Sequence, residues 1–433
     1  MEIVLKILLA LAAAVGGLLA IVGWQSMTRG TTVRRVQAPE DGNGPPSPVD
    51  PAFCDTLALL TKTTIVPGHS VEVFKNGNET YPRLWKDLRA ARRSLTLQMY
   101  YCQPGRMADE FKSILLERAA AGVRVLFLRD AFGSGALTKE YIAELEAGGV
   151  EVASFRPTQW YHFYKVYHRS HIRVVVIDGV VGYTGGFGID DKWLGDGEHK
   201  DQWRDTNARF TGPAVLQHQA TFAAGWAEAT GTLLSGDLFF PEKGAHGDKG
   251  EIYAGLLHAS PSAGSTSAER FFAFAIGSAQ HTLCISNAYF VPGDNFCELL
   301  TSAVRRGVDV KVLTCGEIGD VKSTYHAGRA TYAGLLANGV RIFEYQPAMM
   351  HAKSIVSDGR FVATGTVNFD NRSMSFNDET TLLAVDEKLA THMAELFASD
   401  LEKAIEITAE SHAARPVQGK MLDWAWSLAA RVL

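Results

Sequence analysis

Apolar and polar positions divide the chain into an N-terminal apolar run, a polar spacer and a long body of alternating apolar and amphipathic segments. The stretch from Ile7 to Trp24 carries no charged residue, and with the residues before it the run reaches the length of about 20 residues that crosses a bilayer. This pattern predicts a transmembrane helix or signal anchor over residues 1–25. A cleaved signal peptide is the alternative, but no clear small-x-small site follows the run, and Trp24 suits a membrane interface.

Charges flank the apolar run unevenly. Glu2 and Lys6 precede it, whereas Arg29, Arg34 and Arg35 follow it. Basic residues favour the cytoplasmic side, so this distribution predicts a single-pass protein whose body lies in the cytoplasm.

A polar spacer comes next. Residues 36–52 contain five prolines and few apolar side chains. Proline-rich polar segments form extended spacers, so residues 26–52 are predicted to be a disordered linker.

The body repeats itself at intervals of 180 to 191 residues. Each copy contains a helix end, a glycine and a β-branched strand, in the same order. The matched segments are 94–101 with 282–290, 116–126 with 300–310, and 141–152 with 332–342. Alternating strands and helices predict an α/β fold of two α-β-α halves around mixed, mainly parallel sheets, related by a pseudo-two-fold axis. The expected halves are residues 53–235 and 250–412, joined through Leu233–Lys249 and followed by an amphipathic helix over 413–433.

The composition excludes several classes of function. The chain has 433 residues, of which 46% are hydrophobic, and a formal net charge of −5. This balance argues against a nucleic-acid partner, which usually requires a basic surface. The five cysteines form no CxxC pair and predict neither a disulfide framework nor a zinc site.

A histidine motif occurs at the same place in each half. The second copy reads HAKSIVSDGRFVATGTVN and starts at His351; the first reads HIRVVVIDGVVGYTGGFG and starts at His171, 180 residues earlier. The elements of the second copy are His351, Lys353, Asp358, Gly365, Thr366 and Asn368. Those of the first are His171, Arg173, Asp178, Gly185, Gly186 and Gly188.

This spacing predicts a phosphate pocket that contains an imidazole. A strand places His351 and Lys353 on one face, and a turn at Asp358 returns the chain through a second strand. Small residues at Gly365, Thr366, Gly185 and Gly186 would let a phosphate approach backbone N–H groups, and Asn368 would add an amide donor.

Two such pockets facing each other would cleave a phosphodiester. One histidine would attack phosphorus to form a phosphohistidine, and the other would protonate the leaving alcohol. Lys353 and Arg173 would neutralise the phosphoryl oxygens. The sequence contains no HExxH, EF-hand or Walker A pattern, so neither a metal nor another cofactor is expected.

The pattern H-x-K-x4-D-x6-G-[ST]-x-N, present twice, resembles the signature of the phospholipase D superfamily. The resemblance covers residues 65–412 and is strongest to bacterial cardiolipin synthases, through Tyr289–Pro292, Trp203–Thr206 and Asn368–Glu379. The resemblance implies that an acidic group orients each histidine, for which Asp205 and Glu379 are the candidates. It also implies that His171 is the nucleophile and His351 the acid, although the reverse assignment remains open. Asp178 and Asp358 are motif residues and hence catalytic candidates, with support of a turn as the favoured interpretation.

The first copy departs from the pattern at two positions. Arg173 replaces the expected lysine, and Gly188 replaces the expected asparagine. Arginine keeps the charge with a different shape, whereas glycine lacks a side-chain donor.

Three features favour a lipid substrate: the N-terminal helix, the aromatic run Trp160–Tyr167 and the apolar C-terminal run Met421–Leu433. Core packing is the alternative for the second, and docking onto the body for the third. The resemblance therefore implies a phosphatidyl transferase, most simply one that converts two phosphatidylglycerol molecules into cardiolipin and glycerol. Phospholipid hydrolysis and a catalytically weakened scaffold are the alternatives, and a nuclease is the least favoured. The sequence leaves the oligomeric state open.

Overall fold

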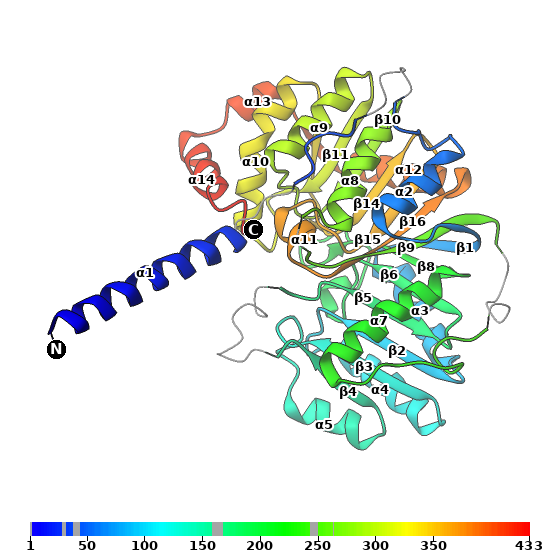
Figure 1. Cartoon of the computed structure of the whole chain (residues 1–433). Coiled ribbons are helices and arrows are strands. Elements are labelled where there is room, and N and C mark those ends of the chain that lie inside the picture. Colours follow the sequence, from blue (N-terminus) through cyan, green and yellow to red (C-terminus); the bar gives the residue numbers. More distant parts are fainter. Residues whose placement is uncertain (1, 28–31, 38–43, 158–167, 243–249, 263) are drawn as a thin grey trace.

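The computed structural model describes residues 2–27, 32–37, 44–157, 168–242, 250–262 and 264–433. Two α/β halves share one mixed sheet of 15 strands, with helices on both faces (Figure 1). The predicted architecture of two repeated halves is therefore confirmed.

The first half begins with alternating strands and helices, continues with several strands in succession and ends in a helix. Its elements are β1 (Val66–Lys75), α3 (Asn76–Arg89), β2 (Ser94–Met99), α4 (Arg106–Ala120), β3 (Arg124–Asp130), α5 (Lys139–Ala147), β4 (Glu151–Phe155), β5 (Arg173–Ile177), β6 (Val181–Gly185), η1 (Asp191–Trp193), β7 (Trp203–Arg204), β8 (Thr206–Thr211) and α7 (Ala214–Thr230).

The second half repeats this order and adds elements at its end. It contains β9 (Ile252–Ala259), α8 (Ser267–Ser278), β10 (Thr282–Asn287), α9 (Asp294–Arg305), β11 (Asp309–Cys315), α10 (Lys322–Ala337), β12 (Arg341–Tyr345), β13 (Met349–Met350), β14 (Lys353–Ser357), β15 (Phe361–Gly365), α11 (Asn371–Ser375), β16 (Glu379–Val385), α12 (Glu387–Leu401), β17 (Ala404–Ile407), α13 (Ala409–Ala413) and α14 (Val417–Ser427).

The strand order shows the internal symmetry directly. From the centre outward, one side runs β9-β16-β15-β14-β10-β11-β12 and the other runs β1-β8-β6-β5-β2-β3-β4, with β1 and β9 paired antiparallel in the middle. Equivalent strands therefore occupy equivalent places on the two sides of the central pair, as the pseudo-two-fold relation requires.

Parallel and antiparallel pairing occupy different parts of the sheet. The parallel pairs are β2–β3, β3–β4, β10–β11 and β11–β12, where a helix connects each strand to the next. The histidine motifs instead form tight hairpins, β5–β6 and β14–β15, and a short turn can only join antiparallel strands.

Each half contributes side chains to the hydrophobic core of the other half. Helix α2 (Ala52–Thr61), at the start of the predicted first half, buries Phe53 and Leu57 in the hydrophobic core of the second half. Helix α12 contributes Phe397 to the core of the first half. The halves thus share side chains across their boundary, which places the two histidine motifs in one rigid body.

The apolar N-terminal run forms one helix, α1 (Glu2–Met27), which projects from the body (Figure 1). Among the residues that the structure describes, none of the helices combines the length and the apolar character that crossing a membrane requires.

The predicted disordered linker over residues 26–52 is wrong for its described parts. Val33 and Val36 pack against the core of the second half, and the side chain of Asn295 donates a hydrogen bond to the carbonyl of Val33. Ser47 is buried and caps the turn before α2 by donating to Asp50. A few apolar side chains suffice to hold a proline-rich segment against a surface, which composition alone does not reveal. The aromatic run 160–167 and residues 243–249 of the predicted connection lie outside the described residues.

Candidate active site

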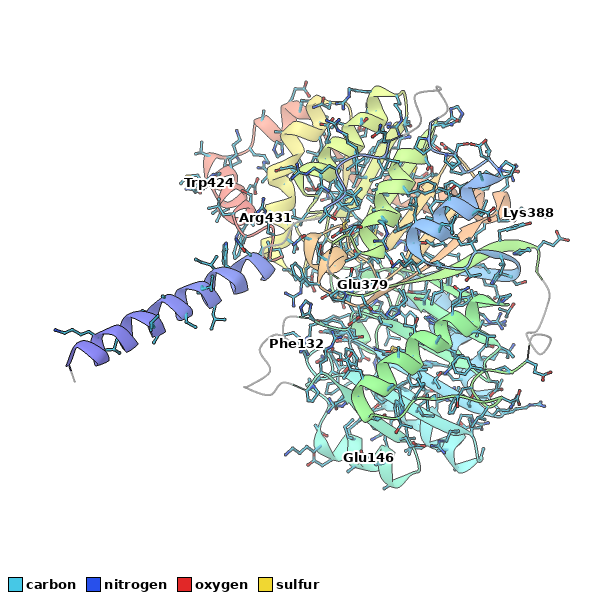
Figure 2. The ribbon with its side chains drawn as sticks, in the orientation of Figure 1. Phe132, Glu146, Glu379, Lys388, Trp424 and Arg431 are labelled. Carbon is cyan, nitrogen blue, oxygen red and sulfur yellow. The ribbon has the colours of Figure 1, made fainter. Side chains whose placement is uncertain are left out.

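The two histidines pair with acidic residues from the opposite halves. His171 Nδ1 lies 3.0 Å from both carboxylate oxygens of Glu379, and His351 Nδ1 lies 2.7 Å from Asp205 Oδ2. All four side chains are buried, and Figure 2 shows Glu379 between the halves. The site therefore exists only when both halves are assembled.

Backbone contacts fix this crossed arrangement. The N–H of His171 donates to the carbonyl of Asp378, the residue before Glu379, over 2.9 Å. The N–H of His351 donates to the carbonyl of Arg204, the residue before Asp205, over 2.7 Å. The short parallel pair β7–β13 continues the second contact. Each imidazole and its acid are thus held by main chain as well as by side chain.

Each motif also supplies a buried cation. Lys353 Nζ donates to the carbonyl of His351 over 2.5 Å, and Arg173 donates to the carbonyls of His171 and Phe187 over 2.9 and 3.1 Å. Arg173 and Lys353 are 1% and 3% exposed, so their charges are poorly screened by water.

The charges of the two motifs act on one another. Burial lowers the pKa of His171 well below its usual value, and the charges of Arg173, Lys353 and His351 add to this effect. Burial and Lys353 lower the pKa of His351 to about 4. Both imidazoles are consequently neutral near pH 7, and the charges of each motif act on the histidine of the other.

The acids differ in their surroundings. Burial opposes ionisation of Asp205, but His351, Lys353 and the indole of Trp193 together lower its pKa. Burial raises the pKa of Glu379 well above its usual value, against the hydrogen bond that the Thr366 hydroxyl donates to it.

The small residues of the motifs make room for these acids. A Cβ at Gly186 would lie 2.3 Å from Asp205 Oδ1, and a Cβ at Gly365 would lie 2.2 Å from the carbonyl of Thr380. A Cβ at Gly185 would lie 2.4 Å from Asn207 Oδ1. The prediction that Gly185, Gly186 and Gly365 open the backbone to a phosphate is therefore wrong, because close packing of neighbouring strands and acids fills these spaces.

Thr366 contacts the acidic residue Glu379. Its hydroxyl donates to Glu379, and its backbone N–H donates to the carbonyl of Thr380 over 2.8 Å. It is not available as the predicted phosphate ligand, since both of its donors are already used. Asn368, in contrast, is 3% exposed, and its side-chain oxygen has no hydrogen-bond partner among the described residues. That oxygen is an acceptor and does not itself bind an anionic phosphate, so donation from the Asn368 amide to a phosphate stays a prediction.

The structure explains why glycine occupies position 188. A Cβ at this position would lie 2.8 Å from the indole ring of Trp193, whose N–H donates to Asp205 Oδ2 over 2.8 Å. Trp193 follows His171 by 22 residues, and the residue at the same distance after His351 is Ser373. Position 188 therefore holds a glycine against Trp193, whereas the corresponding positions of the second half hold Asn368 and Ser373.

The contact between Gly188 and Trp193 predicts a specific coupling in stability. Gly188→Asn should destabilise the fold by about 1–3 kcal/mol, because the new side chain collides with a fully buried ring. The double variant Gly188→Asn, Trp193→Ser should lose less stability than the two single variants lose together. It removes the ring with which the new asparagine collides, and it gives the two positions the residue types that Asn368 and Ser373 provide in the second half. Thermal unfolding of the four proteins in one detergent measures this coupling, and purely additive effects would contradict it.

The motif aspartates lie away from the histidines. Asp178 accepts hydrogen bonds from the backbone N–H groups of Arg92, Arg93 and Ser94, and Asp358 accepts them from Gln280, His281 and Thr282. Both aspartates have positive φ angles, 54° and 51°, which the hairpin turns require. This geometry agrees with the favoured interpretation that each aspartate supports a turn, at the far end of the strand that follows its histidine, and it places neither carboxylate beside a histidine.

Removing such a support should affect stability and not chemistry. Asp358→Ala leaves three N–H groups at the start of β10 without their acceptor, which should cost about 1–3 kcal/mol of stability. Turnover per folded molecule should stay within about twofold of wild type. Unfolding and activity measured on the same preparation check both parts, and a large loss of turnover in a stable protein would return Asp358 to the catalytic set.

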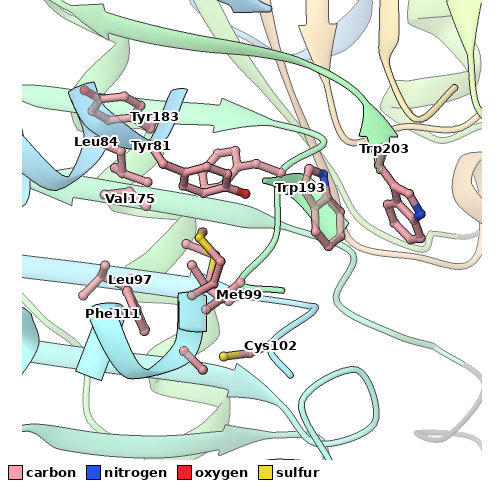
Figure 3. Packing of buried hydrophobic residues seen from close by; sticks show 14 of the residues in the cluster. Tyr81, Leu84, Leu97, Met99, Cys102, Phe111, Val175, Tyr183, Trp193 and Trp203 are labelled. Carbon is pink, nitrogen blue, oxygen red and sulfur yellow. The ribbon is translucent and has the colours of Figure 1, made fainter. Parts of the chain in front are cut away.

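The sequence alone did not identify several aromatic neighbours. The ring of Tyr100 meets His171 edge-on with centroids 5.0 Å apart, and the rings of Trp193 and Trp203 lie 5.4 and 4.6 Å from His351. Figure 3 shows both tryptophans at one end of the buried core. They exclude water from one side of each imidazole. No local spacing in the sequence connects these three aromatic residues to the histidines.

The segments that resembled family runs lie around the site. Arg204, beside Asp205, forms a buried ion pair with Asp400 of α12 at 2.6 Å. Tyr289 donates its hydroxyl to Asp320 over 2.8 Å, and the N–H of Val291 donates to the carbonyl of Phe369. These contacts brace the strand ends that carry the histidine pairs. Among the described residues, no group of three or more His, Cys, Asp or Glu side chains is arranged to hold a metal ion.

Comparison with known proteins agrees with this geometry. The family model described as "Cardiolipin synthase, PLD-like domain" matches residues 273–401. Cardiolipin synthase A of Pseudomonas syringae pv. syringae (strain B728a) is 34% identical over 363 residues, which are 83% of this chain and 74% of that protein. Cardiolipin synthase A of Pseudomonas entomophila (strain L48) is 33% identical over 82% of this chain and 73% of that protein.

Solved structures support the fold. Phosphatidylserine synthase of Haemophilus influenzae Rd KW20 superposes with a TM-score of 0.66 at 12% identity, covering 88% of this chain and all of that one. Polyphosphate kinase of Porphyromonas gingivalis gives a TM-score of 0.51 at 12% identity, covering 91% of this chain and 57% of that one. With these relatives and this doubled histidine site, the chain belongs to the cardiolipin synthase family, the phosphatidyltransferases of the phospholipase D superfamily.

Proposed function

We propose that this enzyme transfers a phosphatidyl group from one phosphatidylglycerol molecule to a second, giving cardiolipin and glycerol. The observation that carries the proposal is the crossed pair of imidazole–carboxylate contacts, buried together with two cations. The relatives that are 33–34% identical over 82–83% of the chain are named cardiolipin synthases, which supports the choice of substrate.

The carboxylates determine which imidazole nitrogen reacts. Glu379 and Asp205 accept hydrogen bonds at Nδ1 of His171 and His351, so each histidine keeps its proton on Nδ1 and presents a free Nε2 lone pair. A neutral imidazole in this tautomer can attack phosphorus or exchange a proton. We assign the attack to His171 and the proton transfer to His351.

The first half-reaction forms the covalent intermediate. His171 Nε2 attacks phosphorus, the bond to the glycerol oxygen breaks, and protonated His351 gives its Nε2 proton to that oxygen. In the second, the now neutral His351 takes a proton from a hydroxyl of the incoming phosphatidylglycerol. That oxygen attacks phosphorus and the N–P bond breaks, which regenerates both histidines.

Arg173 and Lys353 hold the anionic phosphate in this scheme, with Asn368 as a further donor. A bound phosphodiester offsets the two positive charges that depress the pKa of His351 in the free enzyme. Substrate binding therefore raises the pKa of His351 and allows it to carry the proton that the leaving glycerol requires.

Lys353 gives the proposal a pH signature. Burial lowers the pKa of Lys353 to about 7, and the charge of Arg173 adds to this effect. Because kcat/KM reports the free enzyme, in which the pKa of His351 is about 4, kcat/KM already falls above that pH, and loss of the Lys353 charge should steepen the fall above pH 7 by up to about tenfold per pH unit. Lys353→Arg keeps its charge, so its profile should lack this second, steeper phase even if its maximum rate is lower. A steeper phase that stays in place in Lys353→Arg would show that another group causes it.

We further propose that the enzyme works at a bacterial inner membrane, attached through α1. Seven large apolar side chains of this helix, among them Leu9, Leu19 and Trp24, are 54–66% exposed in the isolated chain. That α1 crosses the membrane once, with the body in the cytoplasm, stays a prediction. Protease accessibility of a C-terminal tag in spheroplasts and in inverted vesicles tests it.

The function is tested by incubating purified protein with phosphatidylglycerol vesicles and reading lipid products by mass. Cardiolipin together with released glycerol supports the transferase. Phosphatidic acid as the sole product would identify a hydrolase that uses the same residues. Failure of wild type on every phospholipid would support the scaffold alternative.

A further inference from the structure

The C-terminal helix α14 presents two different faces. Asp423 is 4% exposed and accepts hydrogen bonds from His326 of α10, over 2.8 Å, and from Arg415. This buried contact fixes the helix on the body. The predicted docking of the C-terminal run is therefore present on this face.

The opposite face is apolar and uncovered. Val417, Met421, Trp424 and Leu428 are 71%, 64%, 65% and 71% exposed. Their spacing of four, three and four residues places them along a single stripe of the helix. A folded protein gains nothing in water from such a stripe, so a partner must cover it.

The location of the stripe indicates which partner this is. Helix α14 lies on the side of the body from which α1 projects (Figure 1), and the labels of Trp424, Arg431 and Phe132 lie toward that side (Figure 2). Phe132 belongs to the other half of the protein and is 66% exposed. Exposed apolar side chains thus occur in both halves, which suits an extended surface better than a single protein groove.

Basic residues lie near the apolar stripe. Arg34, Arg35 and Arg431 line an open groove of about 1030 Å³ beside the end of α14, and the acidic residues Asp294, Glu298 and the buried Asp370 line it as well. Lys420 is the charged residue on the solvent side of the helix, whose single acid, Asp423, is buried. Tryptophan beside basic residues is typical of elements that lie in the interface of an anionic bilayer.

We propose that α14 is a second membrane contact, which inserts the stripe of Val417, Met421, Trp424 and Leu428 into an anionic lipid surface while Arg431 and the groove arginines contact its headgroups. With α1 this contact gives two attachment points on one side of the body. The body is then held in a fixed orientation relative to the bilayer. The contact itself does not depend on the proposed reaction.

Fluorescence of the full-length protein reconstituted into phosphatidylglycerol vesicles with brominated acyl chains tests the insertion. Bromine quenches indoles within the bilayer, so Trp424→Phe should lose a clear share of the quenchable emission. The matched control Trp226→Phe removes a buried indole and should lose none of it. Equal quenching of wild type and Trp424→Phe would overturn the proposal, whether or not the enzyme makes cardiolipin.

A kinetic measurement separates the bilayer from a second protein copy. Met421→Ser with Leu428→Ser should raise the surface concentration of phosphatidylglycerol needed for half-maximal rate by about three- to tenfold, with kcat unchanged. Leu59→Ser is the control, because Leu59 is 80% exposed on α2 at the other side of the view in Figure 1. A change in oligomeric state with no change in this concentration would show that a second copy covers the stripe and would overturn the proposal.

Discussion

His171→Ala and His351→Ala should each lower the rate of cardiolipin formation by at least about 10³-fold while leaving the fold intact. Removal of the nucleophile eliminates the covalent route, and removal of the proton donor leaves glycerol as a poor leaving group. Both side chains sit in preformed contacts with acids, so alanine leaves a small cavity and the backbone hydrogen bonds of both residues remain. Product mass and thermal unfolding on the same preparations measure the two parts.

The double variant sharpens this test. Because the histidines act in one sequence of steps, the double variant should be no slower than the slower single variant. His281→Ala is the control, since His281 is exposed and its side chain takes no part in the site. Near-normal activity of either single variant in a folded protein would rule out the two-histidine mechanism.

Glu379→Gln and Asp205→Asn should each lower turnover by about 10²–10⁴-fold, with little effect on stability. An amide can accept the hydrogen bond from Nδ1, but it supplies no negative charge to the imidazolium that forms during the reaction. In the amide variants, the imidazole can also adopt the wrong tautomer. Steady-state rates over a pH series check the size of the effect.

The crossed pairing gives these variants a distinctive pattern. Asp205→Asn should shift the imidazole NMR signals of His351 more than those of His171. Glu379→Gln should have the larger effect on His171, because each acid contacts the histidine of the other half. Glu387→Gln, an exposed change at the start of α12, is the control. Signals that respond within the same half would contradict the geometry.

The sequence predicted the features that depend on local periodicity. The interval of 180 residues between His171 and His351 located both hairpins, and the α/β repeat predicted the two halves of the fold. Asp205 and Glu379 were identified only through family resemblance. That they cross between halves could not be read from the chain, because the pairing depends on how β7 meets β13 and how Ser170 meets Asp378.

Other features required the packing itself. Gly188 reads as a lost donor until Trp193 is seen to occupy its space and to bond Asp205. Asp178 and Asp358 fit a catalytic motif by spacing, yet a hairpin turns the chain at each of them, well beyond the histidine. Small residues near a predicted phosphate pocket likewise proved to accommodate protein atoms. In each case the same sequence pattern is compatible with two structural roles, and the contacts that each residue makes in the folded protein decide which role it has.

The measurement that tests the central claim most directly is capture of the covalent intermediate. The enzyme would be mixed with phosphatidylglycerol, denatured at alkaline pH within its first turnover, digested and analysed by mass. We predict a phosphatidyl group on the peptide that contains His171, formed far more slowly in His351→Ala and absent from His171→Ala. No adduct on either histidine, in an enzyme that makes cardiolipin under the same conditions, would contradict the account and indicate direct transfer between lipids.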